Sequence, residues 1–354
     1  MIIFVFILLV VVAGYYLFKN QVGDVRPAFL PPAKTQTIGD LKPFAKNLGG
    51  VRDLEFSPNG TLLASVPSQG KVIALIKQDN TAQVKDILVN LNSPHGITFF
   101  NNQLFVAEER RVVRYNWNES NLTATEDKIL FDLPPRGNHF TRSLVFDKSG
   151  RLYVSVGSTC NVCNESDPRY GAVLISDADG NNPRVFAKGL RNSVFMTLNP
   201  KTGDIWATDM GRDFLGDNLP PDEINILKED DYGWPDCYGN KVPDTNFNPS
   251  ASCENTEPPI FEIPAHSAPL GLTFDIEGNL LVAYHGSWNR SVPDGYKVVK
   301  LTVSGNTITK AEDFITGFIS GSEATGRPVD LIFDKDGNLY LSDDKSGSIY
   351  VITK

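Results

Sequence analysis

Residues 146–156, FDKSGRLYVSV, place a short polar turn with a glycine between two apolar segments. A hydrophobic strand, a tight Gly or Asn turn and a second hydrophobic strand together are typical of a β-hairpin. The same arrangement occurs six times along the chain. Its turns are FSPNG (56–60), FFNNQ (99–103), FDKSG (146–150), LNPKTG (198–203), FDIEG (274–278) and FDKDG (333–337).

The six hairpins recur at intervals of roughly 40 to 75 residues, which is the spacing of propeller blades with insertions. Further strand-like segments supply a third strand for every hairpin but a fourth strand for only five of them, because the chain stops after a third strand. The segment PFAKNL (43–48) resembles VFAKGL (185–190), a fourth strand. We therefore predict an all-β, six-bladed β-propeller over residues 40–354, in which an N-terminal strand closes the last blade.

The first 18 residues, MIIFVFILLVVVAGYYLF, contain no charged side chain. At about 1.5 Å per residue, such a helix just spans a bilayer core. No basic start or small-residue cleavage site is evident, so a retained transmembrane anchor is favoured over a cleaved signal. Residues 19–39 are polar and contain proline, which suits a linker between the anchor and the propeller.

Charge and cysteine content narrow the partners and the compartment. The chain carries 33 basic and 42 acidic residues, a net charge of -9, so a phosphate backbone would be repelled and no nucleic-acid partner is expected. The spacing of the four cysteines does not match a zinc ribbon. Short separations instead predict the disulfides Cys160–Cys163 and Cys237–Cys253, which place the propeller outside the cytoplasm.

The four histidines of the chain fall in one kind of loop. Strand direction alternates within a blade, so loops between blades and loops between second and third strands share one face of the ring. His95, His139 and His266 lie in loops between blades, and His285 lies between a second and a third strand. All four are therefore expected at one mouth of the central channel, where we predict a ligand site.

Several arginines accompany these histidines on the same predicted face. Arg52 and Arg142 occupy the position equivalent to His95, counted back from the Phe that ends each first strand. Arg191 and Asn192 precede the fourth blade, and Arg327 precedes the sixth. The loop TDMGRDFLGDNLPPDE (208–223) is acidic enough to hold a hard cation such as Ca²⁺, although a solvated acidic loop has the same composition. Its candidate carboxylates are Asp209, Asp213, Asp217, Asp222 and Glu223.

Seven segments of this face carry a family resemblance. They are GNHFTRSLVF (137–146), GLRNSV (189–194), GRDFLGDNLPPDEIN (211–225), DYGWPDCYG (231–239), PAHSAPLG (264–271), HGSWNR (285–290) and GRPVD (326–330). Together they resemble the glucose/sorbosone dehydrogenase family, and its sorbosone-dehydrogenase-like branch most closely. Members of that family are six-bladed propellers that use pyrroloquinoline quinone (PQQ) and Ca²⁺.

The resemblance assigns roles to residues of this chain. It implies that His139 is the catalytic base, that Arg191 and Asn192 contact the quinone, and that Arg327 contacts the cofactor. Arg191 would also stabilise charge that develops on the quinone, together with Ca²⁺. The backbone carbonyls of Gly211 and Arg212 match those that hold the active-site Ca²⁺, and Tyr232 lies in a turn matching one near a structural Ca²⁺.

The chain departs from the better-known glucose dehydrogenases at two places. Val329 stands where those enzymes have a second cofactor-contacting arginine, and Trp288, Asn289 and Arg290 lie near the place of a cofactor-contacting lysine. Arg290 or Arg52 could replace the missing positive charge. The resemblance therefore implies PQQ chemistry without specifying glucose as the substrate.

Three functions remain open from the sequence. The first is a membrane-tethered, extracytoplasmic dehydrogenase that oxidises a sugar, sugar aldehyde or polyol by hydride transfer to PQQ and passes electrons to a separate quinone or cytochrome acceptor. The second is a Ca²⁺-dependent lactonase or esterase, in which a metal-activated water replaces the quinone. The third is a non-catalytic binding propeller. Cofactor chemistry separates the first from the second, and loss of His139 separates both from the third.

Overall fold

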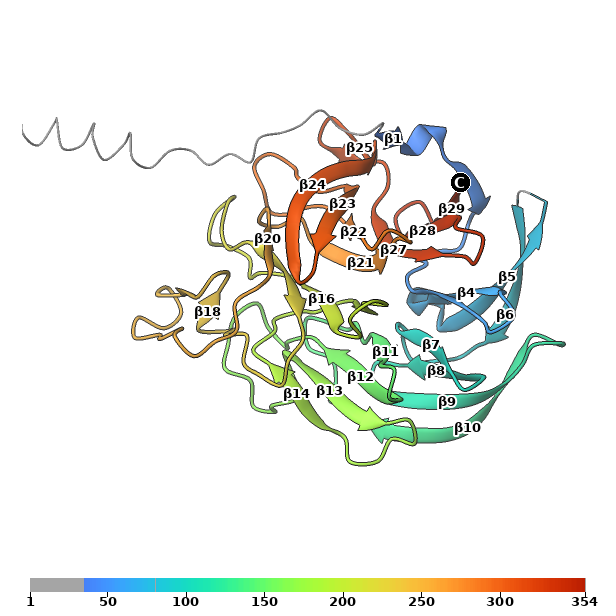
Figure 1. Cartoon of the computed structure of the whole chain (residues 1–354), viewed down its shortest axis with the longest axis horizontal. Coiled ribbons are helices and arrows are strands. Elements are labelled where there is room, and N and C mark those ends of the chain that lie inside the picture. Colours follow the sequence, from blue (N-terminus) through green and yellow to red (C-terminus); the bar gives the residue numbers. More distant parts are fainter. Residues whose placement is uncertain (1–34, 80, 354) are drawn as a thin grey trace, which may run out of the picture. The chain divides into compact units, whose positions relative to one another are not determined.

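The computed structural model describes residues 35–79 and 81–353, in which six sheets are arranged around a common axis (Figure 1). Each sheet has four antiparallel strands, and the fifth sheet gains one further, parallel strand, described below. The first three sheets follow chain order. They are β3 (Leu54–Phe56), β4 (Leu62–Val66), β5 (Lys71–Gln78) and β6 (Thr81–Leu88); β7 (Ile97–Phe100), β8 (Gln103–Ala107), β9 (Arg111–Asn118) and β10 (Thr123–Asp132); and β11 (Leu144–Phe146), β12 (Arg151–Val156), β13 (Ala172–Asp177) and β14 (Arg184–Lys188).

The last three sheets contain the exceptions to simple chain order. They are β15 (Met196–Leu198), β16 (Ile205–Asp209), β17 (Asp222–Ile226) and β20 (Phe261–Ile263); β21 (Pro269–Phe274), β22 (Leu280–Tyr284), β23 (Lys297–Ser304) and β24 (Thr307–Thr316); and β27 (Pro328–Phe333), β28 (Leu339–Asp343), β29 (Ser348–Ile352) and β2 (Lys42–Ala45). Two small hairpins, β18 (Cys237–Tyr238) with β19 (Val242–Pro243) and β25 (Ile319–Ser320) with β26 (Glu323–Ala324), lie outside the blades.

The N-terminal strand β2 pairs antiparallel with β29 and so supplies the outer strand of the sixth blade. In Figure 1 this first part of the described chain, in blue, lies beside the red C-terminal strands. The prediction of a six-bladed propeller closed by an N-terminal strand is confirmed.

The folded unit begins at Thr35, somewhat before the expected boundary at residue 40. Strand β1 (Gln36–Thr37) pairs in parallel with β24, and a short 3₁₀ helix (Ile38–Asp40) follows it. The second 3₁₀ helix is Pro67–Gln69. The predicted anchor, residues 1–18, lies outside the described residues. Within residues 35–79 and 81–353, no helix is both long and apolar enough to cross a membrane.

The turn at residues 146–150 shows why its polar sequence recurs in other blades. The Asp147 carboxylate accepts hydrogen bonds from the backbone N–H groups of Ser149 and Arg151, both at 2.9 Å. Gly150 follows with φ of 83°, a conformation that glycine adopts without strain. Asp275 and Asp334 accept the corresponding backbone bonds in the fifth and sixth blades.

The core consists of apolar clusters between neighbouring blades, so that both faces of each sheet are covered. Strands β4, β16, β22 and β28 are buried along their whole length, as expected for strands covered on both faces. One cluster joins Phe44 of β2 and Tyr340 of the last blade to Leu62 of the first blade, and so seals the ring. Both predicted disulfides, Cys160–Cys163 and Cys237–Cys253, are present.

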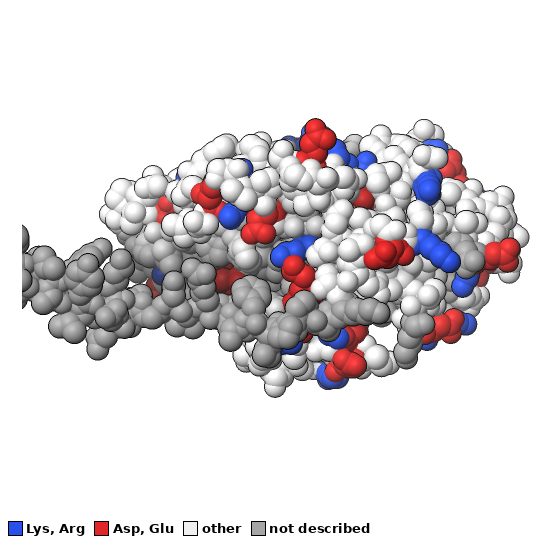
Figure 2. Space-filling view, turned by 90° about the horizontal axis from the view of Figure 1, so that it is seen from above, with Lys and Arg blue, Asp and Glu red and all other residues white. Residues whose placement is uncertain are grey.

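Acidic and basic side chains are interspersed over the face of the molecule seen in Figure 2, and neither sign forms a continuous patch there.

Buried carboxyls link the first, second and sixth blades. Asp53 accepts a hydrogen bond from the Ile97 backbone N–H at 2.7 Å, and Asp330 accepts one from the Leu54 N–H at 2.9 Å. Burial, together with the charge of Asp330, raises the pKa of Asp53 well above its ordinary value. Burial also raises the pKa of Asp330 to about 6 and, with the Asp330 charge, the pKa of Glu55 to about 8.

These raised pKa values predict a pH-dependent stability. A carboxyl that binds its proton more tightly in the folded state stabilises the fold fully below its unfolded pKa, and this contribution is lost as the pH rises through the folded pKa. Between pH 5 and 8, we expect the melting temperature of Asp53→Asn to fall less with rising pH than that of the parent, because asparagine has no carboxyl proton to lose. Its amide oxygen can still accept the Ile97 backbone N–H. Thermal unfolding at stepped pH measures this, with the exposed Asp86→Asn as control. Equal slopes for parent and Asp53→Asn would contradict the prediction.

Candidate active site at the channel mouth

The four histidines lie in the predicted loops, and contacts connect them with the arginines that the sequence places there. His95 precedes β7, His139 precedes β11, His266 precedes β21 and His285 follows β22. One hydrogen-bonded network contains His95 and His285, and a second contains His266. His139 bonds to the loop that follows β12.

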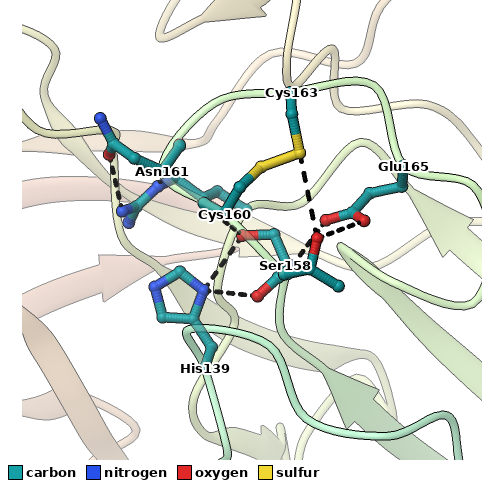
Figure 3. Close-up of a disulfide and its surroundings, with 8 residues drawn as sticks. His139, Ser158, Cys160, Asn161, Cys163 and Glu165 are labelled. Carbon is teal, nitrogen blue, oxygen red and sulfur yellow. Dashed lines mark hydrogen bonds between the residues drawn. A yellow bond between two sulfur atoms is a disulfide. The ribbon is translucent and has the colours of Figure 1, made fainter.

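His139 is part-buried and held through one ring nitrogen. Its Nδ1 lies 2.9 Å from the backbone oxygen of Ser158 and 3.0 Å from the Ser158 hydroxyl (Figure 3). A carbonyl oxygen can only accept, so Nδ1 carries the proton and the lone pair is on Nε2. Nε2 has no hydrogen-bond partner among the described residues. Burial, and then the charge of Arg191, lower the pKa of His139 to about 4, so the imidazole is neutral at ordinary pH.

A glycine allows the two predicted active-site residues His139 and Asn192 to approach. A Cβ on Gly157 would lie 2.5 Å from Asn192 Oδ1 and 2.6 Å from His139 Cβ. Both contacts are closer than real side chains allow. Any other residue at position 157 would therefore move His139, Asn192 or both.

His95 differs from His139 in its surroundings. It is fully buried and packs against the rings of Phe140 and Phe195, with ring centroids 5.9 and 5.1 Å away. Its Nε2 accepts a hydrogen bond from Arg52 Nε at 3.3 Å. Burial and the positive charge of Arg52 keep the pKa of His95 well below its ordinary value. Its only available lone pair is therefore already bonded to a cation.

Asp344, in the loop between β28 and β29, joins three of the predicted residues. It accepts hydrogen bonds from Arg52 Nη1 at 2.6 Å and from His285 Nε2 at 3.0 Å. The other His285 nitrogen accepts from Arg327 Nη1 at 3.2 Å, and Arg327 lies over the ring of Tyr296. Burial acts to raise the pKa of Asp344, but the bonds from His285 and Arg52 outweigh it and lower that pKa to about 2.

Arg191 has a buried, fixed guanidinium. Its Nε donates to the backbone oxygen of Asn161 at 2.9 Å, and its Nη2 donates to Asn161 Oδ1 at 2.9 Å and to Asp213 Oδ2 at 3.3 Å. The backbone N–H groups of Arg191 and Asn192 both donate to the Asp209 carboxylate, at 3.0 and 2.7 Å. The loop that carries Arg191 and Asn192 is therefore attached to the end of β16.

Two loops, residues 210–221 after β16 and residues 285–296 after β22, contact each other beside Arg191. Asn289 Nδ2 donates to Asp213 Oδ1 at 2.9 Å and lies 3.4 Å from His266 Nδ1. Arg290 donates to the backbone oxygens of Asp217 and Ala265, so its guanidinium holds these loops together. The exposed ring of Trp288 packs edge-on against the exposed ring of Phe214.

Arg142, which was predicted to contact the cofactor, has structural surroundings. Arg142 is fully buried and donates to the backbone oxygens of Pro134, His139 and Thr141. It therefore supports the loop that carries His139 and does not reach outward. The family's second arginine is absent here, and Val329 at its place is fully buried in an apolar cluster between blades.

The carbonyls expected to hold Ca²⁺ are available for a cation. Gly211 N donates to Asp222 Oδ1 at 2.9 Å, and Arg212 Nη1 pairs with Asp244 at 2.7 Å. Neither the Gly211 nor the Arg212 carbonyl accepts a hydrogen bond within the described part of the chain. Free carbonyl oxygens beside the carboxylate of Asp213 are the donor type that Ca²⁺ prefers, so this loop fits the ion.

The other residues that were predicted to lie near a metal ion are hydrogen-bonded to the protein backbone instead. Tyr232 is buried and its hydroxyl donates to the Ile226 backbone oxygen at 2.7 Å. Asp209, Asp222 and Glu223 accept backbone N–H groups, and burial raises the pKa of Asp209 to about 8 and that of Asp222 to about 7. Within residues 35–79 and 81–353, the only three His, Cys, Asp or Glu side chains that lie as close together as metal ligands are Cys160, Cys163 and Glu165, and the disulfide leaves those two cysteines without a thiolate to bind a metal. The acidic loop therefore does not gather its carboxylates into one cluster.

Comparison with solved structures shows the class of fold to which the chain belongs. The fold matches a Trichoderma reesei carbohydrate-active enzyme of family AA12, with a TM-score of 0.78, 23% identity, and coverage of 90% of this chain and 97% of that one. It also matches the PQQ domain of a Coprinopsis cinerea pyranose dehydrogenase, with a TM-score of 0.77, 22% identity, and coverage of 92% of this chain and 98% of that one. The fold is therefore the six-bladed propeller of these enzymes. Within that class, the chain belongs to the TrAA12-like family, whose model matches residues 39–354.

Sequence relatives agree with this assignment. A PQQ-dependent sugar dehydrogenase of Hypocrea jecorina is 27% identical over 86% of this chain and 80% of its own length. An uncharacterized protein of Borreliella burgdorferi is 34% identical over 76% of this chain and 77% of its own length. The resemblance to the quinoprotein sugar dehydrogenases is confirmed.

Proposed function

We propose that this chain oxidises a sugar, sugar aldehyde or polyol with PQQ as the hydride acceptor and His139 as the general base. The observation that carries the proposal is the orientation of His139. Its Nδ1–H is fixed on Ser158, its Nε2 lone pair has no partner among the described residues, and burial together with the charge of Arg191 lowers its pKa. A neutral imidazole held in this way can take the proton of a substrate hydroxyl.

The residues at the mouth suit the cofactor. PQQ is an anionic quinone, and Arg52, Arg191 and Arg327 offer guanidinium N–H groups, while Asn192 offers an amide. Within the described residues, Arg52 uses only Nε and Nη1 in hydrogen bonds. Bound PQQ would supply the carbonyl that accepts the hydride, and Ca²⁺ on the Gly211 and Arg212 carbonyls would polarise it.

The chain's own groups perform the remaining tasks. Arg191 is held by Asn161 and Asp213, so its charge is fixed before substrate arrives and needs no reorganisation. His139 takes the hydroxyl proton while the substrate carbon loses its hydride. The adjacent Arg191 charge disfavours the resulting imidazolium, so that proton is readily released to solvent.

We also propose that the propeller works outside the cytoplasm, tethered through residues 1–18, and passes electrons to a separate acceptor. The two disulfides support this placement because such bonds persist in oxidising compartments.

The experiment uses the full-length chain, purified in detergent and loaded with PQQ and Ca²⁺. Aldoses, sugar aldehydes and polyols are offered with an artificial electron-accepting dye, and sugar lactones are offered without one. Dye reduction that depends on both PQQ and sugar supports the dehydrogenase. Lactone hydrolysis without PQQ would instead establish the Ca²⁺-dependent hydrolase, and ligand binding without turnover would establish a binding propeller.

His139 has a spectroscopic signature in the cofactor-free protein. We expect its ring to titrate near pH 4, because burial and Arg191 both disfavour the imidazolium, and to keep its proton on Nδ1 above that pH. Nitrogen-detected NMR of the imidazoles, with His139→Gln to assign the signal, measures both properties. A pKa near the ordinary 6.5, or a proton on Nε2, would contradict the proposed base.

A further inference from the structure

We propose that the disulfide-closed loop Cys160–Cys163 is a positioning element for the site, and that Asn161 within it is the positioning residue for Arg191. The inference rests on the proposed function for its effect on turnover. The inference that this one small loop positions both His139 and Arg191 depends only on the observed contacts. Figure 3 shows the loop with His139 and Asn161 on the side away from Glu165.

The loop reaches His139 through Ser158. The Ser158 hydroxyl contacts His139 Nδ1 and donates to the backbone oxygen of Cys160 at 2.8 Å. The neighbouring Thr159 oxygen accepts the backbone N–H of Asn138 at 2.9 Å, next to the base. Displacement of Cys160 would therefore be passed to the imidazole.

The same loop reaches Arg191 through Asn161. The backbone oxygen and side-chain oxygen of Asn161 accept two separate N–H groups of the guanidinium, each at 2.9 Å. Asn161 Oδ1 also accepts the Asp213 backbone N–H at 2.8 Å, and its Nδ2 donates to the Asp213 backbone oxygen at 3.2 Å. Asn161 therefore fixes both Arg191 and the acidic partner of Arg191.

The disulfide explains how a loop without regular secondary structure can hold this geometry. Cys160 and Cys163 flank Asn161 and close a ring of four residues. Beyond the ring, Glu165 accepts the backbone N–H and the hydroxyl of Thr159 at 2.6 and 2.7 Å. The cross-link removes backbone conformations that would otherwise turn the Asn161 carbonyl away from Arg191.

The test compares the full-length parent with Asn161→Ala and with Cys160→Ser/Cys163→Ser. The matched control is Asn279→Ala, which also removes side-chain hydrogen bonds but in a turn of the FDIEG hairpin. Hydrogen exchange at the backbone amides of Asn138 and Ser158, measured without PQQ, shows how stably the hydrogen bonds around the loop are held. Turnover of the PQQ-loaded protein is measured in parallel, as is the double variant Asn161→Ala/Arg191→Lys.

We expect both loop variants to exchange these amides at least tenfold faster than the parent, while the control does not. Turnover should fall by roughly 10², the cost of misplacing a catalytic group by about 1 Å. Asn161→Ala should reduce turnover less than threefold when Arg191 is already Lys, because the Asn161 side chain affects turnover through its bond to the Arg191 guanidinium. Full additivity, or exchange and turnover within twofold of the parent, would overturn the proposal.

The outcomes separate this inference from the proposed function. If the parent neither binds PQQ nor oxidises sugars, the dehydrogenase proposal fails, and the exchange measurement alone decides the role of the loop. If Asn161→Ala does not fold, the hydrogen exchange of the Cys160→Ser/Cys163→Ser variant decides whether the loop positions the site.

Discussion

His139→Gln is expected to reduce turnover by roughly 10² to 10⁴, the usual contribution of a positioned general base. The glutamine amide can still donate to the Ser158 oxygen, so the loop and the melting temperature should change little. The loss should appear in kcat more than in KM, because proton removal belongs to the transition state. Steady-state dye reduction at saturating PQQ and Ca²⁺ measures this, together with the Ca²⁺ content.

His95→Gln is the matched control for this prediction. His95 also lies between two blades but is enclosed by Phe140 and Phe195 with its Nε2 bonded to Arg52. Its substitution should affect stability more than turnover. If His95→Gln abolishes turnover while His139→Gln stays within a few-fold of the parent, the base has been assigned to the wrong blade.

Arg191→Lys is expected to lower kcat by roughly 10² to 10³, comparable to the loss of one preorganised donor at a developing negative charge. A lysine ammonium lacks the planar fork that lets Arg191 bond both oxygens of Asn161 and the Asp213 carboxylate at once. The affinity for PQQ should fall as well. Equilibrium titration with PQQ in the absence of substrate, alongside dye reduction, measures both effects.

Arg184→Lys is the matched control for Arg191→Lys, since Arg184 makes a bidentate ion pair with Glu229 on the exposed outer side of the third blade. It should leave kcat and PQQ affinity within about twofold, because exposed pairs contribute little. Equal, small effects of both substitutions would show that Arg191 is only a structural residue.

The fold could be predicted because its information is local and repeated. Each hairpin carries its own turn, as Asp147 and Gly150 show, and the missing fourth strand points to PFAKNL. Strand β1 was not predictable in the same way. It has only two residues and pairs in parallel with β24, far along the chain, so no periodic pattern marks it.

The candidate site was predictable to the level of loops but not of side-chain direction. Equivalent positions in a repeat fix where a Cα atom lies, so Arg52, His95 and Arg142 lie on the same face of the propeller. The direction of each side chain is not fixed in this way, and the Arg142 guanidinium donates to three backbone carbonyls of the protein itself. Asp344 was missed although it lies between second and third strands, the kind of loop already assigned to this face. Asn161 was missed because the flanking cysteines indicated only a disulfide.

Strand β2 pairs with β29, so the first strand of the sixth blade to leave the ribosome must wait for the last one to be made. Blades one to five can assemble while translation continues, since their strands are consecutive apart from the added β1. The last blade, and with it the seal between Phe44 and the first blade, can form only after β29 has been made. A chain stopped short of β29 would therefore retain an open ring and expose the pairing edge of β28.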